Sequence, residues 1–247
     1  LTLTEGSVIV TDPSGELAAM TARHRATVGP VVFINPFGGT FTAETGIAFE
    51  DTGFNPLSVL DPASPNFHTE VSAFARLLMV TDRRDSGSYW NDEGAEYLAL
   101  RIAGMKRYLP EETHTLTTLY EMMRDDPELT KAELEALAEK DDPAIAADAR
   151  RFRGLVDTPA QWAGVLSKAA LAAKRYAPGT PLGIHTAKNG FDVGRLKRER
   201  VTVYLLVPSS LLAASLPWLN LLVGVFGTAI GRPGPRSPVT LLIDEAP

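Results

Sequence analysis

Val239-Thr-Leu-Leu-Ile-Asp-Glu-Ala-Pro247 is the stretch of this sequence that decides the fold. The run before the acids is apolar or β-branched without polar alternation, which predicts a strand buried on both faces, as in a parallel sheet. Two carboxylates, Asp244 and Glu245, follow at the end of the strand where α/β sheets bind ligands. Such a pair can hold Mg²⁺ and orient an attacking water, or it can be a solvated acidic turn. These nine residues leave both interpretations open.

The composition is that of a soluble globular protein. The 247 residues suffice for one large domain or two small ones, and 45% of them are hydrophobic. A net charge of −6 argues against a simple polyanion binder. The absence of Cys excludes disulfides and thiolate metal sites, and it fits a reducing compartment. From its ends, we expect the chain to be a piece of a larger protein.

The first 65 residues contain a strand–helix–strand pattern. Residues 7–11 and 31–35 are short apolar strands, and a helix beginning near Glu16 is expected to bury Leu17, Met20 and Ala26. Two strands joined by a helix predict a parallel sheet. Residues 35–53 lack a sustained period and are predicted to form a loop, followed by an ordered turn at 54–57 that tucks two apolar residues inward.

Residues 66–178 are predicted to be entirely helical. Apolar residues recur at helical spacing in 66–80 and 89–109, and further helices are expected near 113–124, 130–140, 142–154 and 159–176. Thr130 with Glu133 forms a capping box, and Pro143 and Pro159 occupy first helical positions. Residues 111–148 hold twelve acidic and three basic residues, a balance of −9, which favours a solvated helical face over a docking site.

Strands return in residues 179–247. A strand at 201–207, a helix at 211–230 and the strand at 239–243 are expected. No charged residue lies between Arg200 and Arg232, but the strand-like start and the Pro and Gly interruptions favour a buried strand and helix over a membrane span. The one notable basic cluster is either a surface loop or a contact for DNA or phosphate. Its candidate DNA-contact residues are Arg195, Lys197, Arg198 and Arg200.

Several common sites are absent from the sequence. No Gly-Lys pair occurs, so there is no Walker A loop to bind phosphates. No Gly-x-Ser-x-Gly elbow or Ser-x-x-Lys pair suggests a serine hydrolase. The four histidines are far apart in sequence and are expected to be surface or half-buried residues rather than metal ligands.

Taken together, ordered segments across nearly the whole chain resemble the coupling ATPases of type IV secretion systems, the conjugative DNA-transfer proteins. The matching segments are Ser7-Val-Ile-Val-Thr-Asp-Pro-Ser-Gly-Glu-Leu17, Thr21-Ala-Arg-His-Arg25, Gly29-Pro-Val-Val-Phe-Ile-Asn-Pro-Phe37, Phe54-Asn-Pro-Leu57, Trp90-Asn-Asp-Glu93, Phe191-Asp-Val193, Thr202-Val-Tyr-Leu-Leu-Val-Pro208 and Leu241-Leu-Ile-Asp-Glu-Ala246. Ser14 stands where the family usually has Lys.

The resemblance implies an α/β fold: a partial RecA-like P-loop NTPase sheet with an inserted all-helical domain. The nucleotide-binding domain would comprise 1–65 and 179–247, and the insertion 66–178. It also implies a hexamer at the cytoplasmic face of the bacterial inner membrane, anchored by segments outside this chain. This hexameric ring would recruit DNA–relaxase or protein substrates, hydrolyse ATP and work with secretion-channel components.

By residue, the resemblance implies that Asp244 holds Mg²⁺ through its water shell and that Glu245 polarises the attacking water. Asp12, Gly15 and Glu16 would lie near the nucleotide. ATP and Mg²⁺ would belong to the full-length parent. Because Walker A is missing, we expect the 247 residues alone to bind no nucleotide tightly and to be inactive. We also expect an exposed gap in the sheet and a tendency to aggregate.

Other interpretations remain. The chain could be a non-catalytic substrate-recruiting module on a degenerate P-loop-like scaffold, and an intact Walker A loop upstream would exclude this. A septal DNA translocase fits less well, because its motor is not expected to carry the helical insertion. A metal-dependent hydrolase using Asp12 and Asp244 lacks a supporting His or third carboxylate.

Overall fold

The computed structural model describes residues 4–79, 89–232, 234 and 238–243. The chain divides into two compact units. The sheet unit comprises Leu1–Val59 and Ile184–Pro247, and the helical unit comprises Leu60–Gly183.

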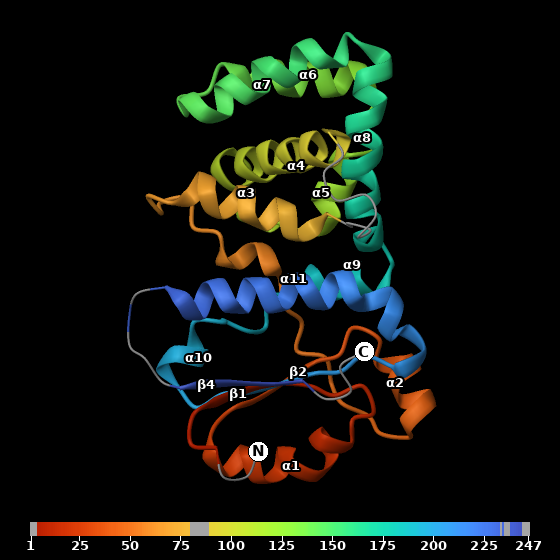
Figure 1. Ribbon diagram of the computed structural model, residues 1–247, viewed down its shortest axis with the longest axis vertical. Helices are drawn as coiled ribbons and strands as arrows, with labels where there is room; N and C mark the ends of the chain where they lie inside the picture. Colours follow the sequence, from red (N-terminus) through yellow and green to blue (C-terminus); the bar gives the residue numbers. More distant parts are fainter. Residues whose placement is uncertain (1–3, 80–88, 233, 235–237, 244–247) are drawn as a thin grey trace. The chain divides into compact units, whose positions relative to one another are not determined.

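The sheet unit alternates strands with helices (Figure 1). Its described elements are β1 (Ser7–Thr11), α1 (Glu16–Val28), β2 (Val31–Ile34), α2 (Gly38–Thr45), the 3₁₀ turn η1 (Pro56–Val59), α9 (Pro181–Thr186, which begins in the helical unit), α10 (Arg195–Arg198), β3 (Thr202–Leu205), η4 (Ser209–Leu211), α11 (Leu212–Gly231) and β4 (Val239–Ile243).

The four described strands form one parallel sheet in the order β2-β3-β1-β4. Thr11 at the end of β1 pairs with Leu205 of β3 and with Ile243 of β4, and Ile34 of β2 also pairs with Leu205. The carboxyl ends of all four strands are therefore aligned at one edge of the sheet. The predicted parallel sheet is confirmed.

The two faces of the sheet are covered by different helices, α1 on one side and α11 on the other (Figure 1). Val8, Val10 and Tyr204 pack with Ala18 of α1 and with Phe41. This buried apolar contact, rather than intrinsic helix propensity, holds α1 on the sheet.

Helix α11 confirms the helix expected near 211–230, and it is buried along one side only, with 39% of its most apolar window buried. Ser209–Gly231 is the one described segment that is long and apolar enough to cross a membrane, with a mean hydropathy of 1.6. Within the sheet unit, Trp218, Leu222 and Phe226 are buried. Phe226 packs 5.3 Å from Phe54, measured between ring centroids, and Phe54 and Leu57 are the apolar residues that the turn was predicted to tuck inward.

The buried side of α1 differs from the prediction. Met20, expected on the buried face, is 77% exposed, whereas Ala18, Thr21 and Arg25 are buried. The apolar spacing was misleading because the side of α1 against the sheet carries polar groups that are satisfied there: the Thr21 and Tyr204 hydroxyls lie 2.7 Å apart.

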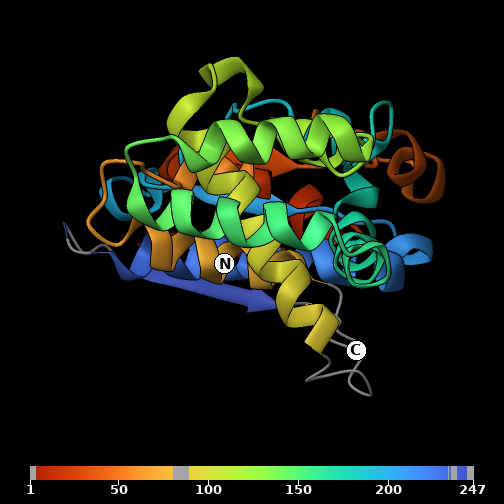
Figure 2. The same cartoon turned by 90° about the horizontal axis from the view of Figure 1, so that it is seen from above.

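Two further expectations for the sheet unit are wrong. The predicted loop at 35–53 contains α2, whose side chain Phe41 is fully buried. Strand β4 was predicted to be buried on both faces, but Leu241 is 44% and Ile243 56% exposed. The reason is that β4 is the outermost described strand, with β1 as its one neighbour (Figure 2, dark blue arrow).

The helical unit confirms the predicted helical texture. Its main described helices are α3 (Phe67–Leu78), α4 (Tyr89–Tyr108), α5 (Leu116–Met122), α6 (Pro127–Ala138), α7 (Pro143–Val156) and α8 (Pro159–Ala173), with 3₁₀ turns η2 (Glu111–Thr113) and η3 (Lys174–Tyr176). Tyr97 lies at the centre of its core, with its ring 5.1 Å from Phe152 and 4.9 Å from Trp162, edge-on to both.

Helices α6 and α7 begin with an Asp cap followed by proline, whereas α8 has a first-turn proline after Thr158, whose side chain makes no cap hydrogen bond. Pro143 and Pro159 occupy the expected first-turn positions. The predicted capping box at Thr130 is wrong, because α6 already begins at Pro127. Asp126 accepts hydrogen bonds from the Glu128 and Leu129 amides at 3.0 and 2.9 Å, so it is the stronger cap.

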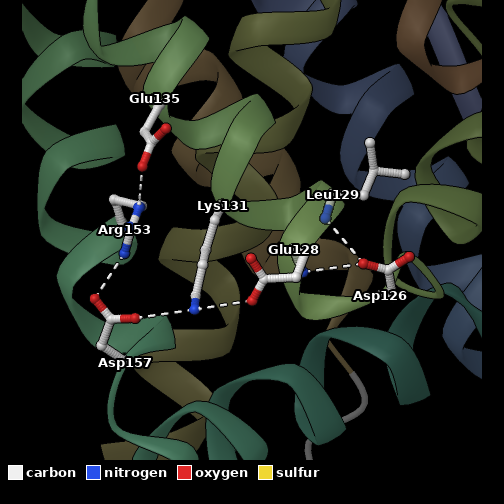
Figure 3. A network of polar contacts seen from close by, with 7 residues as sticks. All are labelled: Asp126, Glu128, Leu129, Lys131, Glu135, Arg153 and Asp157. Carbon is white, nitrogen blue, oxygen red and sulfur yellow. Dashed lines mark hydrogen bonds and ion pairs between the residues drawn. The ribbon is translucent and has the colours of Figure 1, made fainter.

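Most of the acidic run is exposed, although Asp142 is buried, and cations on α6 and α7 partly neutralise it (Figure 3). Arg153 pairs with both Glu135 and Asp157 at 2.7 Å. Lys131 pairs with Glu128 and Asp157 at 3.1 Å. Hydrogen bonds from Arg153 and then Lys131 lower the pKa of Asp157. This is the solvated face that the composition predicts, and such exposed pairs add little stability.

Candidate functional site at the carboxyl edge of the sheet

Asp12 follows β1 at the carboxyl edge of the sheet and is fully buried. Its Oδ2 accepts a hydrogen bond from the Ala18 amide at 2.7 Å, and its Oδ1 accepts one from the Ser14 hydroxyl at 3.4 Å. The Asp12 amide donates to the Leu205 carbonyl at 3.0 Å. Asp12 therefore fixes the turn from β1 to the first turn of α1, where the helix dipole favours a negative charge.

Gly15 and Glu16 form the rest of this turn. Gly15 has a φ of +73°, and a Cβ placed on it would lie 2.4 Å from Cζ of Phe41. Glu16 is the exposed first residue of α1. The structure thus brings Asp12, Gly15 and Glu16 into one tight turn at the expected edge. Their closeness to a nucleotide stays a prediction.

We expect Gly15→Ala to destabilise the sheet unit by about 3 kcal/mol, since it combines a left-handed backbone with a steric clash. Gly46→Ala is the matched control, because Gly46 has the same φ of +73° but an added methyl group there would meet no atom within 4 Å. It should cost only about 1 kcal/mol. Urea unfolding measures both, and equal midpoints for the two variants would contradict this packing.

A second pair, the half-buried Asp51 and the buried His185, lies at the same edge. Nδ1 of His185 is 2.9 Å from both carboxylate oxygens of Asp51. Oδ1 of Asp51 also accepts the amide of Asn35, the residue that follows β2, at 3.0 Å. His185 is 1% exposed, so the expectation that each histidine is a surface or half-buried residue is wrong here. Its nearest charged partner is 134 positions away in sequence, which no local pattern reveals.

The polar side-chain atoms around this pair are buried. Asn35 Oδ1, His185 Nε2 and Trp218 Nε1 are buried without a described hydrogen-bond partner. The rings of His185 and Trp218 lie 5.7 Å apart, edge-on. Because His185 has almost no solvent access, the pair is suited to holding the segment after β2 in place, and not to acting on a substrate.

The pKa of Asp51 is lowered. Burial alone raises it, but the hydrogen bond and charge of His185 and the amides of Asn35 and Gly53 outweigh burial. A carboxyl in the unfolded chain has a pKa of about 3.9. The ionised Asp51 therefore stabilises the fold above about pH 4, and this contribution is lost as the pH falls through the lower folded-state value.

Asp51→Asn is accordingly expected to cost about 2 kcal/mol at pH 6, with the difference from the unmodified protein shrinking towards pH 3. Urea unfolding at pH 6, 5, 4 and 3 measures it. Glu50→Gln, a change at the exposed neighbouring carboxyl, is the control and should stay within about 0.5 kcal/mol throughout. If the stability difference between Asp51→Asn and the unmodified protein grew as the pH fell, this prediction would be contradicted.

The candidate DNA-contact residues lie at the opposite, amino edge of the sheet. Helix α10 precedes β3, and α2 follows β2 at the other end (Figure 1). Arg195 pairs with Glu199 at 2.8 Å and Arg198 with Asp192 at 2.5 Å, whereas Arg200 is exposed. Lys197 is buried and donates to the Arg232 carbonyl. DNA contact by these residues stays a prediction.

Asp244 and Glu245 lie outside the residues that the structure describes, so their predicted roles with Mg²⁺ and water are untested. Ile243, the last residue of β4, directly precedes Asp244 in the chain. It pairs with Thr11, which directly precedes Asp12. In the described parts of the chain, no group of three or more His, Asp or Glu side chains could hold a metal ion.

Comparisons with known proteins agree with this architecture. TrwBdeltaN70, a bacterial conjugative coupling protein in an unbound monoclinic form, matches with a TM-score of 0.59 and 13% identity. The match covers 96% of this chain and 47% of that one, so the chain spans about half the length of this solved structure. The likeness shows the fold, and the predicted class is confirmed: an α/β RecA-like parallel sheet with an all-helical part. No curated protein matches the chain.

A family model supplies the functional context. The model for type IV secretory system conjugative DNA transfer matches residues 1–247, the whole chain. The predicted resemblance to conjugative coupling proteins is thereby confirmed. This chain belongs to the type IV secretory system conjugative DNA transfer family.

Proposed function

We propose that this chain is part of an ATP-driven coupling protein that recruits DNA–relaxase or protein substrates and passes them to a type IV secretion channel. The observation that carries the proposal is the family match along all 247 residues. The solved coupling protein with the same fold adds support, because its match extends over both units of the chain.

In this proposal the sheet unit forms part of the ATP site. The aligned carboxyl ends of β1 and β4 support a nucleotide at that edge, as in other parallel sheets. Asp244 holds Mg²⁺ through water, and Glu245 polarises the water that attacks the γ-phosphate. The buried Asp12 carboxylate supports a turn-shaping role for Asp12, with Glu16 as the exposed group of that turn.

The helical unit is the proposed recruiting part. Its separate core around Tyr97 supports a unit that is distinct from the sheet unit. In the longer protein we propose a homo-hexamer on the cytoplasmic face of the bacterial inner membrane. There it works with channel components.

The first test is ATP hydrolysis by two purified proteins, the 247-residue chain and a longer protein that contains it. The sequence has no Gly-Lys pair and hence no Walker A loop. We therefore expect the longer protein to hydrolyse ATP and the chain alone to give only background phosphate release. Turnover by the chain alone, abolished by Glu245→Gln, would contradict the proposed division of the site.

A further inference from the structure

A hollow of about 410 Å³ opens at the amino edge of the sheet unit, away from the carboxyl edge proposed to bind ATP. Its wall comes from three parts of the chain. η1 contributes Val59, the end of α11 leads to Arg232, and α10 with its preceding turn contributes Asp192, Lys197 and Arg198. This volume is within the usual range for small-molecule pockets.

The wall of this hollow is electropositive. Among the residues that the structure describes, its charged lining residues are three cations, Lys197, Arg198 and Arg232, and one carboxylate, Asp192, which gives a net charge of +2. Asp192 already accepts from Arg198 at 2.5 Å and from the Gly194 amide at 2.8 Å. The single carboxylate is therefore engaged with the most exposed cation.

Lys197 is the unusual member of the set. It is only 8% exposed, although lysine is almost never buried without a charged partner. Its ammonium donates to the Arg232 carbonyl, and it forms no ion pair with any carboxylate that the structure describes. An ammonium has three N–H donors, and the described part of the chain engages one of them, so two remain for a group that enters the hollow.

We propose that this hollow binds a terminal phosphate group, either as inorganic phosphate or as the end of a small phosphate monoester. The Lys197 ammonium is recessed, and a terminal phosphate can reach it because it presents three oxygens at its tip. An internal phosphodiester is flanked by sugars and therefore reaches the ammonium less readily. Lys197 supplies the buried charge, and Arg198 turns from Asp192 to the phosphate when the ligand is bound. The site is separate from the proposed ATP site and does not depend on it.

The test is calorimetric titration of the 247-residue chain with inorganic phosphate at constant ionic strength. Lys197→Met is expected to weaken binding about 10- to 100-fold, through loss of charge-assisted hydrogen bonds. Arg195→Gln is the matched control, since it removes one positive charge from the same helix outside the hollow and should change affinity less than about twofold. Absent binding, or equal losses in the two variants, would overturn the proposal.

Asp192→Asn gives an independent result of opposite sign. Asp192 is exposed, so the fold should tolerate the change, and removing its charge should tighten phosphate binding about fivefold. Weaker binding by this variant would overturn the proposal, even if Lys197→Met fails to fold. Two single-stranded oligonucleotides, one with a 5′-phosphate and one with a 5′-hydroxyl, complete the test. Equal competition by both would overturn it in favour of a phosphodiester groove, and competition by the phosphorylated one alone would support it.

Discussion

Glu245→Gln is expected to lower ATP turnover by the longer protein at least about 100-fold, because the amide cannot polarise the attacking water as a carboxylate does. Glutamine has nearly the same size and shape, so nucleotide binding should be kept while the chemical step is lost. Steady-state phosphate release at saturating ATP measures the effect, and a fluorescent nucleotide titration checks binding.

Glu50→Gln is the matched control for this turnover measurement. It makes the same chemical change at an exposed carboxyl of the sheet unit, and turnover should be unaltered. If Glu245→Gln retained turnover within about threefold of the unmodified protein, the acidic pair after β4 would be the solvated turn that its sequence also allows.

Arg25→Met is expected to destabilise the sheet unit by about 3–5 kcal/mol, enough to unfold a marginally stable domain. Arg25 on α1 is fully buried. Its Nε donates to Oγ1 of Thr202 at 2.7 Å, and its Nη groups donate to the carbonyls of Thr4 at 2.5 Å and Gly6 at 2.9 Å. Methionine fills the space but leaves all three oxygens without this donor, the Thr202 and Gly6 oxygens in buried positions.

Arg23→Met is the control that distinguishes loss of the Arg25 hydrogen bonds from loss of a positive charge on α1. Arg23 is exposed on the same helix, so its replacement should change the free energy of unfolding by no more than about 0.5 kcal/mol. Urea unfolding followed by circular dichroism compares the two. Equal midpoints would show that the three bonds of Arg25 add no net stability.

Elements with strong local signals were predictable from the sequence. The strands at 7–11 and 31–34 and the long helices α4 and α11 lie where hydrophobic periodicity places them. Helix α2 was missed because it begins Gly38-Gly39-Thr40, which are poor helix formers, and because Phe41 is the one buried side chain that it carries.

Features set by tertiary contacts were not predictable. No local pattern shows that Arg25 is buried and Met20 exposed, since the choice depends on carbonyls that β1 and its preceding residues present to α1. Likewise, an apolar run cannot tell a central strand from β4, whose exposure depends on how many neighbours it has in the sheet.

The candidate site divides in the same way. The turn Asp12 to Glu16 was found from its motif and its place after a strand. The Asp51–His185 pair was missed, because its members come from segments 134 positions apart and neither belongs to a local motif. Lys197 was recognised as basic, but its burial beside the Arg232 carbonyl required the fold.

The central claim is that this chain works in an ATP-driven coupling protein for conjugative DNA transfer. Plasmid transfer frequency from donor cells tests it most directly, with the longer gene replaced by the Glu245→Gln form or by the Glu50→Gln control at matched protein levels. We predict that transfer is lost with Glu245→Gln and unchanged with Glu50→Gln. Normal transfer from donors that carry only the Glu245→Gln protein would contradict the claim.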